Sequence, residues 1–258
     1  MTVTFHKYQG TGNDFIIIDN RNFNFPKKDS SLIATLCDRH FGIGADGLIL
    51  LEDHENVDFS MIYFNADGHE STMCGNGGRC IVAFAKELKL FKKATTFYAI
   101  DGIHSAKINS NKVSLQMIDV HNVLVSKDFV FMNTGSPHHI EIVENLNNLS
   151  VIDRGRAIIQ SLYSSEGCNI NFVEQLDHKT FKVRTYERGV EDETLACGTG
   201  VTAVAIAMHK IGKSDSNHIK LEVLGGHLEV QFIAKEESYT DIILSGPAQL
   251  VFKGTLNL

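Results

Sequence analysis

The stretch Cys74-Gly75-Asn76-Gly77 is repeated 123 residues later as Cys197-Gly198-Thr199-Gly200. The two copies align without a gap, and cysteine is an uncommon residue type in this chain. Further landmarks fall on the same offset: Thr11-Gly12 on Thr134-Gly135, Gly44 on Gly167, Tyr63 on Tyr186, Gly102 on Gly225 and His104 on His227. Chance similarity between two glycine turns is the alternative, but it accounts poorly for an ordered set of matches. We infer an internal duplication of about half the chain.

Each half contains one strongly apolar helical pattern, which we expect to begin directly after its C-G-x-G motif, at 77–90 and 200–211. Both patterns are apolar on nearly every side, as is typical of a buried helix. Short apolar runs between turn residues predict strands at matching places in both halves. These runs are 15–19, 47–51, 58–64 and 113–117, then 140–143, 171–174, 179–186 and 228–233. The pattern predicts an α+β protein in which a sheet wrapped around a central helix is built twice.

The composition narrows the class of protein. The chain has 258 residues, of which 43% are hydrophobic and 21% charged, and this favours a globular protein over a disordered one. Its net charge of −7 provides no basic surface for nucleic acid or for a membrane. The longest apolar helical run is far shorter than the ~20 residues that a membrane span needs. With no signal-peptide pattern at its start, the chain is expected to be cytoplasmic.

The five cysteines are Cys37, Cys74, Cys80, Cys168 and Cys197. No two of them form a C-x-x-C pair, so the sequence predicts neither a zinc site nor a thioredoxin-type site, and we expect no metal. A disulfide scaffold is not expected in a chain of this length without a secretion signal. Thiols in a reducing compartment are commonly small buried hydrophobes, and we expect this of at least two of the five.

The repeated pair, Cys74 and Cys197, is placed where a thiol can react. Each is expected at the start of a helix, where backbone N–H groups and the helix dipole favour negative charge and lower a thiol pKa. The same N–H groups can bind a carboxylate. If a pseudo-twofold axis relates the halves, a carbon between the two cysteines has a base on one face and an acid on the other. That arrangement inverts a stereocentre by proton transfer. Two cysteines retained for packing before a glycine turn are the alternative.

Six motifs, in this order along the chain, together resemble the diaminopimelate epimerase family: GTGNDF (10–15), DRHFGIGADG (38–47), NADG (65–68), MCGNGGRC (73–80), NINF (169–172) and ERG…TLACGTG (187–200). The resemblance ends with SGPAQLVFKG (245–254). It implies an enzyme that needs no cofactor and interconverts LL- and meso-diaminopimelate for lysine and cell-wall synthesis. It also implies a homodimer.

The fold implied by this resemblance has two pseudo-symmetric domains, each a mixed, mostly antiparallel β-sheet rolled around a central helix. The first domain is expected to comprise residues 1–118 with 249–258, and the second residues 119–248. The closing strand at 250–258 would return to the first half. The active site is expected in the cleft between the domains.

The resemblance also implies roles for individual residues. Cys74 and Cys197 correspond to the catalytic pair, with Cys197 as proton acceptor and Cys74 as proton donor in the LL-to-meso direction. The remaining positions are implied to bind substrate through backbone N–H groups or side chains: Asn13, Asn65, Gly75, Asn76, Asn169, Glu187, Arg188, Gly198 and Thr199. Arg188 is the expected partner of the distal carboxylate. His138 and Glu187 correspond to positions that tune the pKa of the cysteines.

Three features depart from the family pattern. Ser136 stands where the family often has Asn, so we expect it to contact substrate at shorter reach or through water. Gly47 stands where some members have Gln, so no side-chain contact is expected there. The segment 187–197 is one residue longer than usual, and its acidic stretch at 191–193 is expected to be a solvated loop.

Two alternative functions stay open at this point. A proline or hydroxyproline racemase uses the same two-thiol chemistry but needs no partner for a distal carboxylate. A redox-responsive binding protein, whose two cysteines form a disulfide, belongs to a different class.

Overall fold

The computed structural model describes residues 2–71 and 73–258, and its contacts divide the chain into two compact units. The first unit comprises residues up to Leu115 together with Gly246–Leu258, and the second comprises Gln116–Ser245. Both boundaries fall three residues before the predicted ones. Among the described residues, no helix is long and apolar enough to cross a membrane.

The elements of the first unit are β1 (Thr2–Gly10), β2 (Asn13–Asp19), α1 (Ser30–Cys37), β3 (Gly47–Glu52), β4 (Phe59–Asn65), α2 (Gly75–Glu87), β5 (Ala94–Ala99), β6 (Gly102–Asn109), β7 (Lys112–Gln116) and β17 (Gln249–Asn257). Strand β1 pairs antiparallel with β2 and β17, and β3–β4 and β5–β6–β7 are also antiparallel. The pairs β2–β3 and β4–β5 are parallel. Because a parallel pair needs a crossover, α1 and α2 lie in these two connections.

The second unit repeats this order. Its elements are β8 (Val123–Val125), β9 (Val130–Asn133), β10 (Pro137–Ile142), a short 3₁₀ helix (Leu146–Asn148), α3 (Val151–Leu162), β11 (Asn169–Gln175), β12 (Thr180–Glu187), β13 (Asp192–Thr194), α4 (Gly198–Lys210), β14 (His218–Val223), β15 (Gly226–Ala234) and β16 (Tyr239–Pro247). The parallel pairs β10–β11 and β12–β14 are connected through α3 and α4, and the other pairs are antiparallel. The predicted α+β fold, with one sheet-and-helix arrangement built twice, is confirmed.

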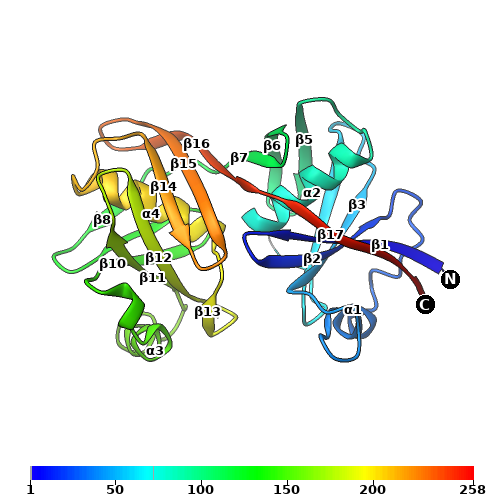
Figure 1. Cartoon of the computed structure of the whole chain (residues 1–258), viewed down its shortest axis with the longest axis horizontal. Coiled ribbons are helices and arrows are strands. Elements are labelled where there is room, and N and C mark those ends of the chain that lie inside the picture. Colours follow the sequence, from blue (N-terminus) through cyan, green and yellow to red (C-terminus); the bar gives the residue numbers. More distant parts are fainter. Residues whose placement is uncertain (1, 72) are drawn as a thin grey trace. The chain divides into compact units, whose positions relative to one another are not determined.

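The central strands are apolar without alternation because both faces of each sheet are covered. In the first unit, Ile16 and Leu48 belong to a core cluster that also contains α1 residues such as Ile33. On the other face, Phe15 and Ile49 lie against Gly77 of α2. In Figure 1, α2 (cyan) lies against the strands of the first unit and α4 (yellow) against those of the second. The central helix is therefore buried in both units.

The predicted starts of the central helices are wrong by two residues. Helix α2 begins at Gly75 and α4 at Gly198, inside the motifs, so that each cysteine is the N-cap residue. The first helical hydrogen bonds run from Gly78 N to Cys74 O (2.7 Å) and from Val201 N to Cys197 O (2.9 Å). The motif glycines therefore form the first helical turn, and their absent side chains permit close packing.

Two further expectations can be compared with the structure. A Cβ atom at Gly47 would lie 2.5 Å from the carbonyl oxygen of Phe64, so this position has no room for a side chain. The acidic stretch at 191–193 is not a simple solvated loop, because it includes β13, which pairs with β12. There, Glu193 forms an ion pair of 2.6 Å with Arg184, and this contact fixes the hairpin.

Candidate functional site

Cys74, the N-cap residue of α2, has an acceptor oxygen beside its sulfur. Its Sγ is 3.7 Å from Oδ1 of Asn13, and the same oxygen accepts a hydrogen bond of 3.1 Å from Nδ2 of Asn76. The Nδ2 of Asn13 donates to a carboxylate oxygen of Asp46. Because a carboxylate only accepts, this bond determines which way the Asn13 amide points. The Cys74 sulfur is therefore next to a group that can accept the thiol hydrogen.

A charge network that runs from the buried Lys7 to the exposed Arg39 holds Asp46 in place. Arg39 forms ion pairs with Asp46 (2.7 Å) and with Asp14 (2.8 Å), and Lys7 forms another with Asp14 (2.8 Å). Burial raises the pKa of Asp14, but hydrogen bonds from Arg39 and Lys7 outweigh it and hold that pKa below its ordinary value. Gly44, with φ of +78°, lies against the Arg39 backbone, where a Cβ would be 2.9 Å from Cα. Residues of the 38–47 motif therefore hold Asp46 in place, and Asp46 fixes the Asn13 amide.

Cys197, the N-cap residue of α4, has a hydroxyl beside its sulfur. Its Sγ is 3.5 Å from Oγ1 of Thr199. Gly200 is required at this point, because a Cβ there would lie 2.5 Å from Oδ1 of Asn171 and 3.3 Å from the Cys197 sulfur. Thr134 Oγ1 donates to the Thr199 carbonyl oxygen at 2.9 Å. Helix α4 and the turn between β9 and β10 therefore hold Cys197 and Thr199 in place.

The hydroxyl of Ser136 connects Thr199 to two buried side chains. It lies 3.2 Å from Thr199 Oγ1, 3.0 Å from His138 Nε2 and 3.1 Å from Asn169 Nδ2. The Asn169 amide has one orientation, because its Oδ1 accepts from the Arg188 backbone N–H and its Nδ2 donates to the Pro137 carbonyl oxygen. Asn169 is therefore a donor to Ser136.

His138 is a donor to Ser136 as well. It is completely buried, and its Nδ1 is 3.1 Å from Nδ2 of Asn171, an amide nitrogen that also donates to the His139 carbonyl oxygen. Nδ1 must therefore accept, which leaves the hydrogen of the neutral ring on Nε2. Burial, with a smaller effect of the Arg188 charge, lowers the pKa of His138 to about 3. The ring is neutral at physiological pH.

These contacts fix which group donates in each hydrogen bond between His138 and Cys197. Because Ser136 accepts from both His138 and Asn169, its own hydrogen is directed to Thr199, and the Thr199 hydrogen is directed to the Cys197 sulfur. A donor therefore faces Cys197, whereas an acceptor faces Cys74. A donor stabilises a thiolate and an acceptor stabilises a thiol.

The opposite directions arise at duplicated positions. On the 123-residue offset, Asn13 corresponds to Ser136, Asp46 to Asn169 and Asn76 to Thr199. The members of each set are joined by hydrogen bonds in their own unit. The duplication therefore kept the positions of three side chains around each cysteine and changed their chemistry.

The buried, neutral His138 predicts a pH dependence of stability. Its pKa falls from 6.5 to about 3 on folding, so between these values the unfolded chain binds a proton that the folded chain does not. The free energy of unfolding therefore falls as the pH falls through this window. From pH 7 to pH 5 we expect the wild type to lose about 2 kcal/mol more than His138→Gln, which has no titrating ring. Urea unfolding at both pH values measures this, and parallel losses in the two proteins contradict it.

The other predicted site residues are placed as follows. Gly75 and Gly198 are the first residues of α2 and α4. Asn65, at the exposed end of β4, makes no side-chain hydrogen bond within the described ranges. Glu187, at the end of β12, accepts a hydrogen bond of 2.6 Å from Thr194 Oγ1. Arg188 is exposed, and its Nη1 donates to the Glu166 carbonyl oxygen at 3.3 Å.

The structure thus brings the predicted residues together in two groups, one in each unit. Asn13, Cys74 and Asn76 form the first, and Ser136, His138, Asn169, Thr199 and Cys197 form the second. Arg188 joins the second group through its backbone. In the described part of the chain, Asn65 has no side-chain hydrogen bond to either group, and Glu187 accepts one from Thr194.

The three cysteines outside the repeat are buried. Burial raises the pKa of the Cys37, Cys80 and Cys168 thiols to about 12 in each case. These thiols stay protonated at neutral pH and are poor nucleophiles. The expectation that at least two of the five cysteines are buried hydrophobes is confirmed.

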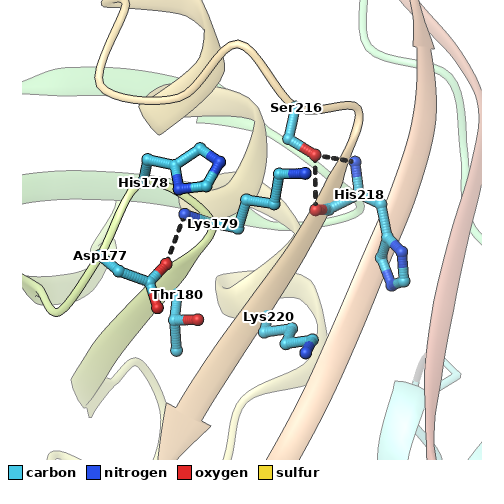
Figure 2. A pocket seen from close by; sticks show the side chains of 7 residues that line it. All are labelled: Asp177, His178, Lys179, Thr180, Ser216, His218 and Lys220. Atoms are coloured by element: carbon cyan, nitrogen blue, oxygen red, sulfur yellow. Dashed lines mark hydrogen bonds between the residues drawn. The ribbon is translucent and has the colours of Figure 1, made fainter.

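A surface hollow of about 380 Å³ lies in the second unit, away from the residues described above. Figure 2 shows its lining, which comes from the β11–β12 turn and the start of β14. The Asp177 carboxylate accepts from the Lys179 backbone N–H (2.7 Å), and His218 is paired with Glu229 (2.8 Å). None of the predicted site residues lines this hollow, so it adds nothing to the candidate site.

Three functional positions escaped the sequence-based prediction: Asp46, Asn171 and Arg79. Asp46 orients Asn13, and its signal was the offset itself, because it corresponds to the predicted Asn169. Asn171 orients His138, and the offset gives no signal for it, because the corresponding residue is Leu48. Arg79 lies inside the quoted MCGNGGRC motif but reads as an ordinary surface residue. Its burial is decided by the packing of α2.

The comparisons with known proteins agree with this geometry. The family model described as diaminopimelate epimerase matches residues 5–121 and 130–251. The chain belongs to the diaminopimelate epimerase family. A diaminopimelate epimerase of Flavobacterium psychrophilum is 58% identical over 97% of this chain and 99% of its own length. One from Chlorobaculum tepidum is 42% identical over 96% of this chain and 99% of its own. The resemblance found in the sequence is confirmed.

Solved structures of other proteins share the fold of this epimerase family member. A phenazine biosynthesis protein of the PhzF family from Bacillus anthracis has a TM-score of 0.80 at 16% identity, with complete coverage of both chains. A probable proline racemase from Agrobacterium radiobacter has a TM-score of 0.74 at 16% identity, covering 99% of this chain and 93% of that one. At such identities the likeness concerns the fold alone. The sequence similarity lies with the epimerases.

Proposed function

We propose that this protein interconverts LL- and meso-diaminopimelate without a cofactor, with one of Cys197 and Cys74 removing the α-proton and the other delivering its own proton to the opposite face. The observation that carries the proposal is the paired environment of the two sulfurs. Each cysteine is the N-cap residue of a buried central helix, and the hydrogen-bond donor at one contrasts with the acceptor at the other. A two-base inversion needs such a pair, with one thiolate and one thiol at the start of each turnover.

In the LL-to-meso direction, Cys197 begins as the thiolate and Cys74 as the thiol. The Thr199 hydroxyl stabilises the charge on Cys197, and the Asn13 oxygen holds the hydrogen of Cys74. Cys197 accepts the α-proton, and Cys74 delivers its proton to the opposite face of the same carbon. After this step Cys197 is the thiol and Cys74 is the thiolate. The meso-to-LL reaction begins from that state.

The reacting carboxylate is proposed to bind at the two helix starts. The hydrogen-bonded ladder of α2 begins at the Gly78 N–H and that of α4 at the Val201 N–H. The N–H groups of Gly75-Asn76 and Gly198-Thr199 precede these points and are suited to an anion. As the α-proton leaves, negative charge grows on the carboxylate, and these donors stabilise it.

The far end of the substrate is proposed to bind Arg188, with Asn65, Asn169 and Glu187 around it. Arg188 has an exposed guanidinium, and in the described part of the chain no carboxylate pairs with it. Its fork suits a bidentate carboxylate contact. Asn169 holds the Arg188 backbone, and Glu187 can accept from a substrate ammonium group. Ser136 supports this end through Asn169 and need not touch the substrate.

The test is proton exchange in heavy water. The purified, reduced protein, without pyridoxal phosphate, is incubated with LL-diaminopimelate. We expect meso product that carries deuterium at the inverted α-carbon, because the proton delivered by Cys74 comes from solvent. The same incubation with L-proline is expected to give no exchange. Absence of exchange into diaminopimelate by folded, reduced protein contradicts the proposal, and exchange into proline favours the racemase.

We also propose a cytoplasmic location. The mechanism needs both catalytic thiols reduced, and the cytoplasm keeps thiols in that state. The pathway implied by family membership, the synthesis of lysine and of cell-wall precursors, is consistent with this.

We further propose that the enzyme is a homodimer, with β17 in the interface. This strand lies beside β1 and exposes apolar side chains, among them Val251 (57% exposed) and Phe252 (46%). Apolar surface of this kind is characteristic of association surfaces. Phe252→Asp is expected to halve the mass measured by analytical ultracentrifugation, because it places a charge in that surface. Phe41→Asp, at an 89% exposed position away from β17, is the matched control. A dimer that tolerates Phe252→Asp contradicts this interface.

A further inference from the structure

Arg79 of α2 has a completely buried guanidinium group that pairs with no carboxylate in the described part of the chain. Its side chain is 0% exposed. It donates to Thr11 Oγ1 (2.8 Å), Asn76 Oδ1 (3.0 Å), the Gly75 carbonyl oxygen (3.3 Å) and the Pro247 carbonyl oxygen (3.4 Å). All four acceptors are neutral, and among the residues described no Asp or Glu contacts it. A buried charge is normally paired with an opposite one, so this arrangement calls for an explanation.

The groups near Arg79 that can become anions are thiols. Burial lowers the pKa of Arg79, and the thiols of Cys80 and Cys74 act in the opposite direction. Cys80 cannot supply the missing charge, because burial raises its pKa to about 12 and keeps it protonated. Cys74 remains. The hydrogen bond from Arg79 to the Gly75 carbonyl oxygen places the guanidinium at the first turn of α2, next to this cysteine.

We propose that Arg79 is a positioning residue for Cys74: its charge stabilises the thiolate that Cys74 becomes on giving up its proton, and it orients the amides beside the sulfur. In that step the S–H bond of Cys74 breaks and a C–H bond forms on the substrate. The electron pair stays on sulfur. The Asn13 oxygen favours the thiol, whereas the helix start and the nearby guanidinium favour the thiolate.

Hydrogen bonds connect Arg79 to Asp46 through the two amide side chains, and the groups at these two ends fix how the amides are oriented. A guanidinium only donates, so Asn76 turns its Oδ1 to Arg79 and its Nδ2 to Asn13. At the other end the Asp46 carboxylate only accepts, so Asn13 turns its Nδ2 to Asp46 and its Oδ1 to Cys74. Arg79 and Asp46 therefore allow a single arrangement of both amides.

The second half of the duplication lacks this cation. The residue that corresponds to Arg79 on the 123-residue offset is Thr202, which is also buried and donates to the Gly198 carbonyl oxygen at 2.9 Å. There the Thr199 hydroxyl faces the Cys197 sulfur and stabilises a thiolate directly. The two halves thus stabilise their thiolates in different ways, by a hydrogen-bond donor at Cys197 and by a buried charge at Cys74.

Other charged groups near the first turn of α2 do not replace Arg79. Asp14, which raises the pKa of Cys80, is paired with Lys7 and Arg39. Asp101 accepts a hydrogen bond from the Met73 backbone, and its carboxylate cannot stabilise a thiolate. His104 is 3.1 Å from Asp101. Lys7 and Arg39, the cations among these neighbours, are already paired with Asp14.

The experiment measures the ionisation of each cysteine. The substrate-free protein is treated with iodoacetamide over a range of pH, and the rates at Cys74 and Cys197 are read separately by peptide mass spectrometry. Arg79→Gln is expected to raise the midpoint of Cys74 by about one pH unit, which makes alkylation at pH 7 about tenfold slower. The midpoint of Cys197 is expected to stay in place. Arg79→Lys keeps a charge and is expected to shift Cys74 less than Arg79→Gln does.

Thr202→Val is the matched control, because it changes the corresponding buried position of the other half, and it is expected to leave the Cys74 profile unchanged. A folded Arg79→Gln protein with an unchanged Cys74 midpoint overturns the proposal. So does an equal shift at both cysteines, which indicates general loosening. The wild type alone provides a test that does not depend on folding of the variant: a Cys74 midpoint at or above the ordinary thiol value of ~8.5 overturns the proposal.

The role of Arg79 in turnover rests on the proposed function, whereas its effect on the ionisation of Cys74 does not. In heavy water, Arg79→Gln is expected to slow exchange into meso-diaminopimelate, which needs the Cys74 thiolate, more than exchange into the LL isomer. A Cys74 midpoint that depends on Arg79 in a protein that never exchanges diaminopimelate removes the proposed function and leaves this inference standing. Equal slowing of both exchanges overturns the role in turnover.

Discussion

Cys74→Ala is expected to lower the conversion of LL- to meso-diaminopimelate by about 10²–10⁴-fold, the usual contribution of one positioned acid or base. Exchange at the α-carbon of the LL isomer should persist. In this variant Cys197 still removes the α-proton and, having exchanged with heavy water, returns a deuteron to the same face. The expected product is deuterated LL-diaminopimelate without inversion, measured by mass spectrometry after chiral separation.

Cys197→Ala is expected to give the mirror result, exchange into the meso isomer without formation of the LL isomer. Its remaining thiol, Cys74, reaches only the opposite face of the carbon. Cys37→Ala is the matched control: it removes a buried cysteine in α1, outside both groups of site residues, and should retain turnover. If either catalytic variant still inverts the centre at near the wild-type rate, the two-base mechanism is wrong.

Arg188→Ala is expected to lower kcat/KM for diaminopimelate by about 10- to 150-fold, mainly through a higher KM. The estimate corresponds to the ~1.5–3 kcal/mol of a hydrogen bond to a charged group. The geometry supports this role, because Gly167 leaves room for the Arg188 stem: a Cβ there would lie 2.9 Å from Arg188 Cδ. Steady-state kinetics with both isomers provide the measurement.

Two comparisons identify the lost interaction. Arg188→Lys keeps the charge without the planar fork and should fall between wild type and Arg188→Ala. Lysine, which lacks the distal carboxylate, should be discriminated against by the wild type and less so by Arg188→Ala. Arg21→Ala, which removes an exposed arginine paired with Asp19 in the first unit, is the control. An unchanged KM in Arg188→Ala contradicts a role in binding the distal carboxylate.

Much of the architecture followed from local patterns. The predicted strand at 47–51 appears as β3 and that at 179–186 as β12, because an apolar run between turn residues satisfies a buried strand wherever it lies. The helix starts were predicted less well. The residues after each cysteine read as a turn in the sequence, whereas the hydrogen bonds from Gly78 and Val201 to the cysteine carbonyl oxygens place Gly75 and Gly198 in the first helical turn.

The amino-acid sequence by itself determined the duplication, the pair of repeated cysteines and the family, because these depend on residue identity and spacing. The tertiary structure alone decided what each cysteine faces. Asn13, Asp46 and Asn76 occupy the same positions around one sulfur that Ser136, Asn169 and Thr199 occupy around the other. Whether an amide or hydroxyl donates or accepts depends on partners far away in the sequence, such as Asp46 for Asn13 and His138 for Ser136. The packing of α2 likewise buries the Arg79 guanidinium, which within residues 2–71 and 73–258 pairs with no carboxylate, and no local pattern in the sequence predicts this.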